Sequence, residues 1–303
     1  MLYEAYKKVA LAGASGNLGS VVLKELIKSN LFEITVLSRA SSTFKYPPEV
    51  KEIKADFESL ESLTTALKGQ QALVSTVASL GVKSQKLLID AAVQAGVKRI
   101  IPSEFGCDLH NAKARTLPVY AAKVEIEKYL DELAVKGQIS YTLLFTGPLL
   151  DFGLKHGIFF NFKERKAELF DGGDYPFSTT TLATAGKAVR RVLTHPPETA
   201  DRAIRVKDID ISQKQLVKLA QALTPGEEWD LKDVDTAELE KQSLEDLKTK
   251  QMKPTTMLNF LRRAIFNPGY GNKWEHVHNS VLGIREMTEP DLEELIHNIF
   301  GPK

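Results

Sequence analysis

The sequence lacks the features that mark secreted, membrane-spanning or nucleic-acid-binding proteins. Its single cysteine, Cys107, excludes an internal disulfide framework and fits a reducing compartment. The longest runs without a charged residue, Gly69–Val82 and Gly137–Leu150, have 14 residues each and contain Ser, Thr, Gln and Gly. Neither run reaches the ~20 apolar residues of a transmembrane helix. Lys and Arg total 40 against 39 for Asp and Glu, which argues against nucleic-acid binding by bulk phosphate neutralisation.

The remaining composition is that of a globular protein. Of the 303 residues, 43% are apolar and 26% are charged, enough to bury a core without compositional disorder. The N-terminus does not resemble a signal peptide, because Glu4 stands in its charged region and the apolar run Val9–Ala14 is short. We therefore expect a soluble cytoplasmic protein with no membrane partner.

The first half of the chain alternates strand-like and helical segments, a pattern typical of a parallel sheet with crossover helices. The strand-like runs are apolar nearly throughout, as expected of strands covered on both faces; they are Val9–Ala12, Ile34–Leu37, Ile53–Ala55, Ala72–Val77, Arg99–Ile101 and Ser140–Phe145. The helical segments between them are Leu18–Lys28, Leu60–Leu67, Ser84–Ala95 and Pro118–Lys136. The sequence therefore predicts an α/β fold with a Rossmann-type doubly wound parallel sheet.

The second half predicts a smaller α+β lid. Residues 1–150 form the expected domain around this sheet, and 151–303 form mainly a lid, with segments such as Ile204–Val206 returning to the sheet. Asp171–Asp174 (Asp-Gly-Gly-Asp) is typical of a hairpin turn, and Glu227–Lys250 of a charged amphipathic helix. Further helices are expected at Thr184–Thr194, Thr256–Phe266 and Pro290–Ile299; the last follows a capping-box-like Thr288-x-x-Asp291.

A glycine-rich loop joins the first strand to the first helix. It reads Gly13-Ala14-Ser15-Gly16-Asn17-Leu18-Gly19. Glycines at this position let the backbone approach a pyrophosphate, and the helix N-terminus offers free N–H groups to it. Gly19 fits the role of close helix–strand packing. The alternative is a tight turn that binds nothing.

The end of the second strand indicates which dinucleotide is preferred. An NAD enzyme places Asp or Glu there for the ribose 2′-hydroxyl, whereas this chain has Ser38-Arg39, followed by Lys45. A guanidinium can grip a 2′-phosphate through paired hydrogen bonds, which favours NADP(H). The alternative is an exposed arginine at a strand end.

Later strand ends offer further cofactor contacts. Asp56 and Phe57 follow the third strand, where adenine could sit, although Asp56 is equally compatible with an ordinary helix cap. The fourth strand ends in Thr76-Val77-Ala78, and the fifth is followed by Pro102-Ser103-Glu104-Phe105-Gly106. In sheets of this kind ligands bind at the carboxyl ends of the strands.

Lys123 occupies an unusual place on the helix predicted at Pro118–Lys136. At 100° per residue it lies within the apolar arc of that helix, which is formed by Val119, Ala122, Ile126, Tyr129, Leu130, Leu133 and Ala134. A solvated lysine belongs on the other face, since burying an unpaired ammonium is costly. Lys123 therefore either snorkels past its neighbours or points into a polar cavity.

Taken together, GASGNLG, Arg39, STVAS at 75–79, IPSEFG at 101–106 and Lys123 resemble the NmrA-like, isoflavone-reductase-like family of atypical short-chain dehydrogenases. The similarity is clear over residues 7–150 and fades after about 210. It implies NADPH binding at the loop and Arg39, and the nicotinamide beside three segments: Thr76, Val77 and Ala78; Ser103, Glu104 and Phe105; Thr146, Gly147 and Pro148. In the plant phenylcoumaran and pinoresinol–lariciresinol reductases of this family, the lysine matching Lys123 takes part in proton transfer.

The sequence departs from typical short-chain dehydrogenases, whose Tyr-x-x-x-Lys motif supplies a tyrosine acid. Val119 stands four residues before Lys123, and Tyr120 is only three before it. Tyr120, Phe152 and His156 are candidate substrate contacts. His276-x-His278 has no third ligand at a suitable spacing, so no metal site is predicted.

Two functions fit these residues. The first is an NADPH-dependent reductase, a monomer or homodimer, that transfers hydride to a small aromatic or conjugated metabolite with Lys123 moving the proton. The second is a non-catalytic NADP(H)-sensing regulator that binds a protein partner. Lys123 favours the enzyme, since proton transfer needs such a group and a sensor does not.

Overall fold

Seven parallel strands form the central sheet, in the order β3-β2-β1-β4-β5-β6-β9. This is a computed structural model, and it describes residues 5–77 and 82–302. The strands are β1 (Lys8–Ala12), β2 (Glu33–Arg39), β3 (Lys51–Ala55), β4 (Ala72–Ser75), β5 (Arg99–Ile101), β6 (Ser140–Phe145) and β9 (Arg202–Arg205). Strand order reverses between β1 and β4, which opens a crevice at the carboxyl ends of these two strands.

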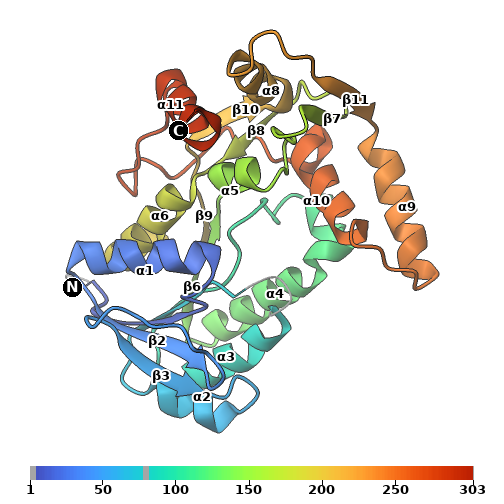
Figure 1. The fold of residues 1–303 in the computed structure, drawn as a ribbon. Coiled ribbons are helices and arrows are strands. Elements are labelled where there is room, and N and C mark those ends of the chain that lie inside the picture. The colour runs from blue at the N-terminus through green and yellow to red at the C-terminus, as the bar shows by residue number, and fades with distance from the viewer. Residues whose placement is uncertain (1–4, 78–81, 303) are drawn as a thin grey trace.

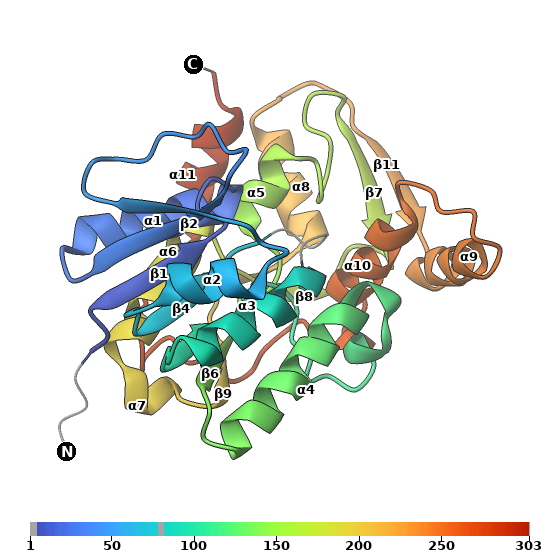
Figure 2. The same cartoon turned by 90° about the horizontal axis from the view of Figure 1, so that it is seen from below.

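Helices cover both faces of the sheet (Figures 1 and 2). Helices α1 (Asn17–Ser29) and α6 (Leu182–Thr194) pack together on one face. The other face carries α2 (Leu60–Leu67), α3 (Val82–Gln94) and α4 (Ala121–Val135), and the 3₁₀ turn η3 (Pro118–Tyr120) leads into α4. Strand β1 shows why its sequence is apolar throughout, since Val9 and Leu11 pack under α1 and α6 while Ala10 and Ala12 join the opposite core.

The seventh strand comes from the second half of the chain. Strand β9 pairs in parallel with β6, from Thr142 opposite Arg202 to Phe145 opposite Arg205. It follows α6 and the short helix α7 (Pro196–Thr199). The expectation that a segment near Ile204–Val206 returns to the sheet is therefore confirmed.

A smaller α+β part lies beside the carboxyl edge of the sheet (Figure 1). It holds two two-stranded sheets, one antiparallel between β8 (Pro176–Thr179) and β10 (Ile209–Ser212), and one parallel between β7 (Lys166–Phe170) and β11 (Asp230–Val234). Its helices and turns are α5 (Leu150–Lys155), α8 (Gln213–Ala222), α9 (Thr236–Lys248), α10 (Thr256–Phe266), η4 (Pro268–Tyr270) and α11 (Glu289–Phe300). The predicted fold class is confirmed.

Two local predictions in this part are wrong. The Asp171–Asp174 turn does not join a hairpin, because β7 and β8 pair with strands far along the chain and not with each other. Helix also does not fill Glu227–Lys250, because Asp230–Val234 is strand β11 and α9 begins only at Thr236. Helix α10 has the predicted bounds, and α11 begins with the predicted capping box of Thr288 and Asp291.

Within the described residues, no helix is long and apolar enough to cross a membrane.

Candidate functional site

A cavity of about 720 Å³ opens at the carboxyl ends of β1, β2, β4 and β5. It lies at the crevice created by the reversal of strand order. Its walls contain most of the predicted site residues, namely Gly13, Ser15, Gly16, Asn17, Leu18, Arg39, Phe57, Thr76, Val77, Ser103, Glu104, Phe105, Lys123 and Phe152.

Close packing fixes the glycine loop against the end of β4. The side-chain hydroxyl of Thr76 donates to the carbonyl oxygen of Ala12 (2.9 Å), and a Cβ atom on Gly13 would lie 2.7 Å from the Thr76 carbonyl oxygen. Gly19 is buried outside the cavity, and a Cβ there would lie only 2.0 Å from the Gly13 oxygen. Gly19 therefore holds the loop against helix α1.

The N-terminus of α1 has the character of an anion site. Its N-cap residue is Gly16, so no side chain occupies the first N–H groups of the helix, and no acidic residue stands in its first turn. These N–H groups and the positive end of the helix dipole face the cavity side of the loop. The arrangement fits the pyrophosphate of a dinucleotide.

Arg39 lies at the far end of this cavity, exposed at the end of β2. Tyr46 was not predicted, and it lines the same cavity with Ser38 and Ser42. The signal that the sequence offers for Tyr46 is an aromatic residue soon after Arg39. Lys45 is exposed and outside the lining. Asp56 is also outside, because its carboxylate accepts the N–H of Glu58 (2.9 Å) in the turn before α2.

Lys123 extends from α4 into the cavity wall, which decides between the two placements left open by the sequence. Its Nζ donates to the carbonyl oxygen of Glu104 and lies 3.8 Å from Oε2 of the same residue. Only 16% of the Lys123 side chain is exposed. The helix therefore presents a largely enclosed ammonium to the cavity, with Glu104 as its counter-charge.

The segment after β5 is anchored to its surroundings. The Ser103 N–H donates to Oε1 of Gln85 (2.8 Å), and the Ser103 hydroxyl donates to the Val77 carbonyl (2.7 Å). Phe105 adopts a φ of 37°, in the left-handed region that is unusual for an aromatic residue. Such strain costs about 1–3 kcal/mol and is typical of functional sites.

Tyr120 does not line the cavity, although it precedes Lys123 by one turn. It is buried, and its hydroxyl is hydrogen-bonded to the Cys107 thiol. Burial raises the pKa of Tyr120 well above its usual range and the pKa of Cys107 to about 11. Both groups therefore stay protonated at neutral pH, and neither is placed to touch a ligand in the cavity.

Of the remaining predicted contacts, Phe152 is part of the cavity lining and the others that the structure describes lie outside it. Phe152 lines the cavity, but His156 is exposed and stacks on the Phe152 ring at 4.0 Å between centroids. Thr146, Gly147 and Pro148 are absent from the lining; the N–H groups of Thr146 and Gly147 donate to the Gly106 carbonyl (3.1 and 3.0 Å) and so brace the segment that carries Glu104. Ala78 falls outside the described residues.

Further lining residues were not among the predicted contacts. They are Ala14, Leu37, Ser38, Ser42, Tyr46, Ser84 and Leu149. Most adjoin a predicted residue in sequence, so neighbourhood was the available signal. No cluster of three or more His, Cys, Asp or Glu suited to a metal occurs in the part of the chain that the structure describes. His278 instead accepts the Arg205 N–H through Nδ1 (3.0 Å).

Comparison with known proteins agrees with this geometry. Residues 5–225 match the NmrA-like family, which is most of the chain. The chain belongs to the NmrA-like family. Oxidoreductase aprR of Aspergillus flavus is 33% identical over 297 residues, covering 97% of this chain and 98% of that protein. Oxidoreductase poxI of Penicillium oxalicum is 35% identical over 73% of this chain and 71% of its own length.

Solved structures share the fold of this NmrA-like chain. AtPrR2 with NADP+ and (+)-pinoresinol has a TM-score of 0.76 at 19% identity, covering 98% of this chain and 100% of that one. An isoflavone reductase has a TM-score of 0.73 at 19% identity, covering 96% of this chain and 98% of its own. The predicted family resemblance is confirmed, and the names of the relatives agree with the predicted oxidoreductase.

Proposed function

We propose that this NmrA-like protein is an NADPH-dependent reductase of a small aromatic or conjugated substrate. One observation carries the proposal: a single cavity joins the uncapped N-terminus of α1, the Arg39 side chain and the Lys123 ammonium. A dinucleotide site and a proton donor therefore share one enclosed space. The full-length relative named an oxidoreductase and the fold neighbours solved with NADP+ or NADPH support this reading.

The binding roles follow from the chemistry of the lining. The loop from Gly13 to Gly19 and the first turn of α1 would hold the pyrophosphate through backbone N–H groups. Arg39 would hold the 2′-phosphate of NADPH, since no carboxylate occupies its position. NADPH supplies the hydride when it is bound.

Lys123 would supply the proton. Reduction of an electron-poor carbon leaves negative charge on a neighbouring substrate atom, which must be protonated. The Lys123 ammonium is a donor in the cavity wall, whereas the Tyr120 hydroxyl is bonded to Cys107 outside it. The smaller part of the molecule, mainly residues 151–303, would act as the lid that excludes water.

The substrate class follows from the apolar part of the lining. Phe105, Leu149 and Phe152 share the cavity with Lys123, so a flat aromatic or conjugated molecule would pack there. The neighbour AtPrR2 was solved with pinoresinol, which supports this class.

The test is NADPH consumption with a panel of phenylpropanoid ethers, enones and quinones. With an active substrate, Lys123→Ala should lower kcat by about 100-fold or more, because positioned proton transfer contributes that much. NADPH affinity should change little. Lys128→Ala, on the exposed face of α4, is the matched control and should keep its activity.

Two outcomes would contradict the proposal. Full turnover by Lys123→Ala would remove Lys123 from the mechanism. Tight NADP(H) binding with no turnover of any compound, together with a stable protein partner, would favour the regulatory function.

A further inference from the structure

Glu104 is the most unusual charged residue beside the cavity. It is 2% exposed, and neither carboxylate oxygen has a hydrogen-bond partner within the described part of the chain. The Lys123 Nζ, at 3.8 Å from Oε2, is the cation that faces it. A buried carboxylate without hydrogen bonds costs folding free energy that an apolar side chain of similar size would not. Stability therefore does not explain this residue.

Glu104 also contacts Lys123 through its backbone carbonyl. The Glu104 N–H donates to the Pro102 carbonyl (2.8 Å), the Phe105 N–H donates to Leu144 (2.9 Å), and Phe105 takes the left-handed φ of 37°. This tight turn leaves the Glu104 carbonyl to accept from Lys123 Nζ. One residue thus contacts the ammonium through both its main chain and its side chain.

The groups around this pair come from three segments. Glu127 lies one turn further along α4, is 4% exposed, and has Arg115 at 4.0 Å. Tyr120 of η3 interacts electrostatically with Glu104, and Cys107 with Lys123. Burial, with the charge of Glu104, raises the pKa of Glu127 to about 8, and burial also raises the pKa of Glu104 against the pull of Lys123. Lys123 is thus the cation that balances Glu104.

We propose that Glu104 is the positioning residue for Lys123: its carbonyl fixes the ammonium at the cavity wall, and its buried carboxylate supplies the counter-charge that keeps a proton available there. The proposal rests on the proposed reductase function, and it assigns to Glu104 no direct contact with the substrate.

The first experiment is the isosteric Glu104→Gln, which removes the charge and keeps the shape. We expect kcat to fall by about 10-fold to 100-fold, because the Lys123 ammonium loses the counter-charge that keeps its proton available, with little change in NADPH affinity. The pH at which kcat is half-maximal should move by roughly one unit. Glu125→Gln makes the same charge change on the exposed face of α4 and should leave both quantities as they are.

The second experiment needs no turnover, so its failure is distinct from failure of the reductase proposal. Lys123 is labelled with acetic anhydride and its rate is compared by mass spectrometry with that of the exposed Lys128 in the same protein. Glu104→Gln should raise the relative rate about threefold or more, because removing the counter-charge favours the neutral amine, which is the form that reacts.

If Glu104→Gln does not fold, Glu104→Asp replaces it, since its shorter side chain withdraws the carboxylate from Nζ. This variant should show a smaller rise in labelling and a smaller fall in kcat. Unchanged labelling of Lys123 in the folded variant would overturn the proposal, as would an unchanged kcat with an unchanged pH profile.

Discussion

At the scale of single residues, the shape and charge of the cavity depend on two glycines that lack a side chain and on Arg39. Gly19 lacks a Cβ where one would collide with the Gly13 carbonyl, and Gly16 leaves the end of α1 uncapped. Arg39 lines the cavity at a position where a carboxylate would repel the 2′-phosphate of NADPH. Each of these three residues can be substituted separately.

Gly19→Ala should disrupt the loop. The new Cβ would lie 2.0 Å from the Gly13 oxygen and 2.7 Å from Thr76 Oγ1, so the backbone must move. We expect a loss of about 2–3 kcal/mol in the free energy of unfolding, measured in urea, as for other overpacked sites. Gly16→Ala places its Cβ 3.3 Å from the same oxygen and should cost much less stability; equal losses would contradict this account.

Arg39→Asp should reverse the preference between the two cofactors. The carboxylate would repel the 2′-phosphate and accept a hydrogen bond from a 2′-hydroxyl. We expect NADPH affinity to fall by about 10-fold or more and NADH affinity to rise, as measured by fluorescence titration. Lys51→Asp, an exposed residue at the amino end of the neighbouring strand β3 and so away from the cavity, controls for net charge. An unchanged ratio of affinities would exclude Arg39 as the selecting residue.

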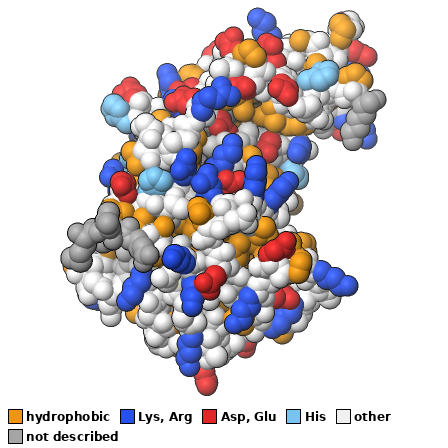
Figure 3. Space-filling model, turned by 90° about the vertical axis from the view of Figure 1, so that its left-hand side faces the viewer, with side chains coloured by type: hydrophobic (Ala, Val, Ile, Leu, Met, Phe, Trp, Pro, Cys, Tyr) orange, Lys and Arg blue, Asp and Glu red, His pale blue; other side chains and the backbone are white. Residues whose placement is uncertain are grey.

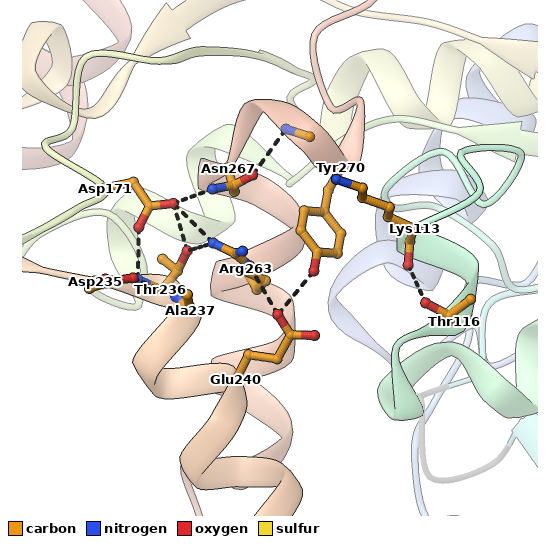
Figure 4. A network of polar contacts seen from close by, with 11 residues as sticks. Lys113, Thr116, Asp171, Asp235, Thr236, Ala237, Glu240, Arg263, Asn267 and Tyr270 are labelled. Atoms are coloured by element: carbon orange, nitrogen blue, oxygen red, sulfur yellow. Dashed lines mark hydrogen bonds and ion pairs between the residues drawn. The ribbon is translucent and has the colours of Figure 1, made fainter.

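At the scale of elements, a polar cluster joins α9 and α10 to the end of β7 (Figure 4). The Asp171 carboxylate accepts from the N–H and hydroxyl of Thr236 (2.7 Å each) and from Asn267 Nδ2 (2.6 Å). Burial opposes ionisation of Asp171, but these hydrogen bonds and Arg263 outweigh it and lower its pKa. Arg263 also donates to Glu240, which accepts from the Tyr270 hydroxyl (3.0 Å). Helix α10 packs against η3, so this cluster supports the start of the Lys123 helix.

Asp171→Ala should loosen α9 and α10 together. The variant removes the acceptor of the Thr236 N–H and hydroxyl and of Asn267 Nδ2, and it removes one anionic partner of Arg263, for which we expect a loss of about 3 kcal/mol. Hydrogen exchange should accelerate in Thr236–Lys248 and Thr256–Phe266. Asp174→Ala, an exposed carboxylate in the same turn that pairs with Lys214, is the control. Exchange confined to the turn would show that Asp171 does not hold the helices.

At the scale of the whole molecule, the hydrophobic cores on the two faces of the sheet differ in extent. The core under α1 and α6 is built mainly from the sheet and these two helices, with Leu282 joining it from late in the chain. The core under α2, α3 and α4 continues into the smaller part through residues such as Phe159, Phe177 and Phe260. On the face in Figure 3, acidic and basic side chains are interspersed, in keeping with the net charge of +1. Among the described residues, the charged ones that line the cavity are Arg39, Glu104 and Lys123.

Stability should decrease as the pH rises from about 5 to about 8. The pKa of Glu127 is raised to about 8 in the folded protein from 4.5, so the folded state holds a proton that the unfolded chain has already released. That contribution is complete below the unfolded pKa and is lost through the folded one. We expect a loss of roughly 2–4 kcal/mol, measured by urea unfolding across this range.

Glu127→Gln should flatten this dependence, since the amide does not titrate. The matched variant Glu132→Gln, exposed on the same helix, should retain the wild-type slope. A slope that Glu127→Gln leaves unchanged would show that Glu127 is not its source.

The segments that the sequence predicted well are those whose pattern is local. Strands β5 and β6 and helix α10 have the predicted bounds, because continuous apolar runs and a 3.6-residue period are set within the segment itself. Strand β11 was missed because Asp-Leu-Lys-Asp-Val is mostly charged and exposed. It is a strand because β7 lies alongside it, with Leu231 opposite Ala167, a pairing that no local pattern reveals.

The candidate site divides in the same way. The glycine loop, Arg39 and Lys123 could be assigned from the sequence, since a fixed spacing after a strand, or a charge within an apolar arc, is a local signal. The sequence predicted Tyr120 as a substrate contact and Thr146 as a cofactor contact, whereas the structure puts the first against Cys107 and the second behind Gly106. It also gave no reason to single out Glu104 from its neighbours.

By itself, the sequence determined the order of strands and helices in the first half of the chain, and it singled out the loop that we propose receives a pyrophosphate and the arginine that we propose selects between dinucleotides. Only the tertiary structure decided that Lys123 faces the cavity and that Glu104 is its partner. The physical reason is that these depend on the end of β5 meeting the side of α4, and the two residues stand 19 positions apart in the chain. Burial, and with it the strength of every charge in the site, exists only once those elements are packed.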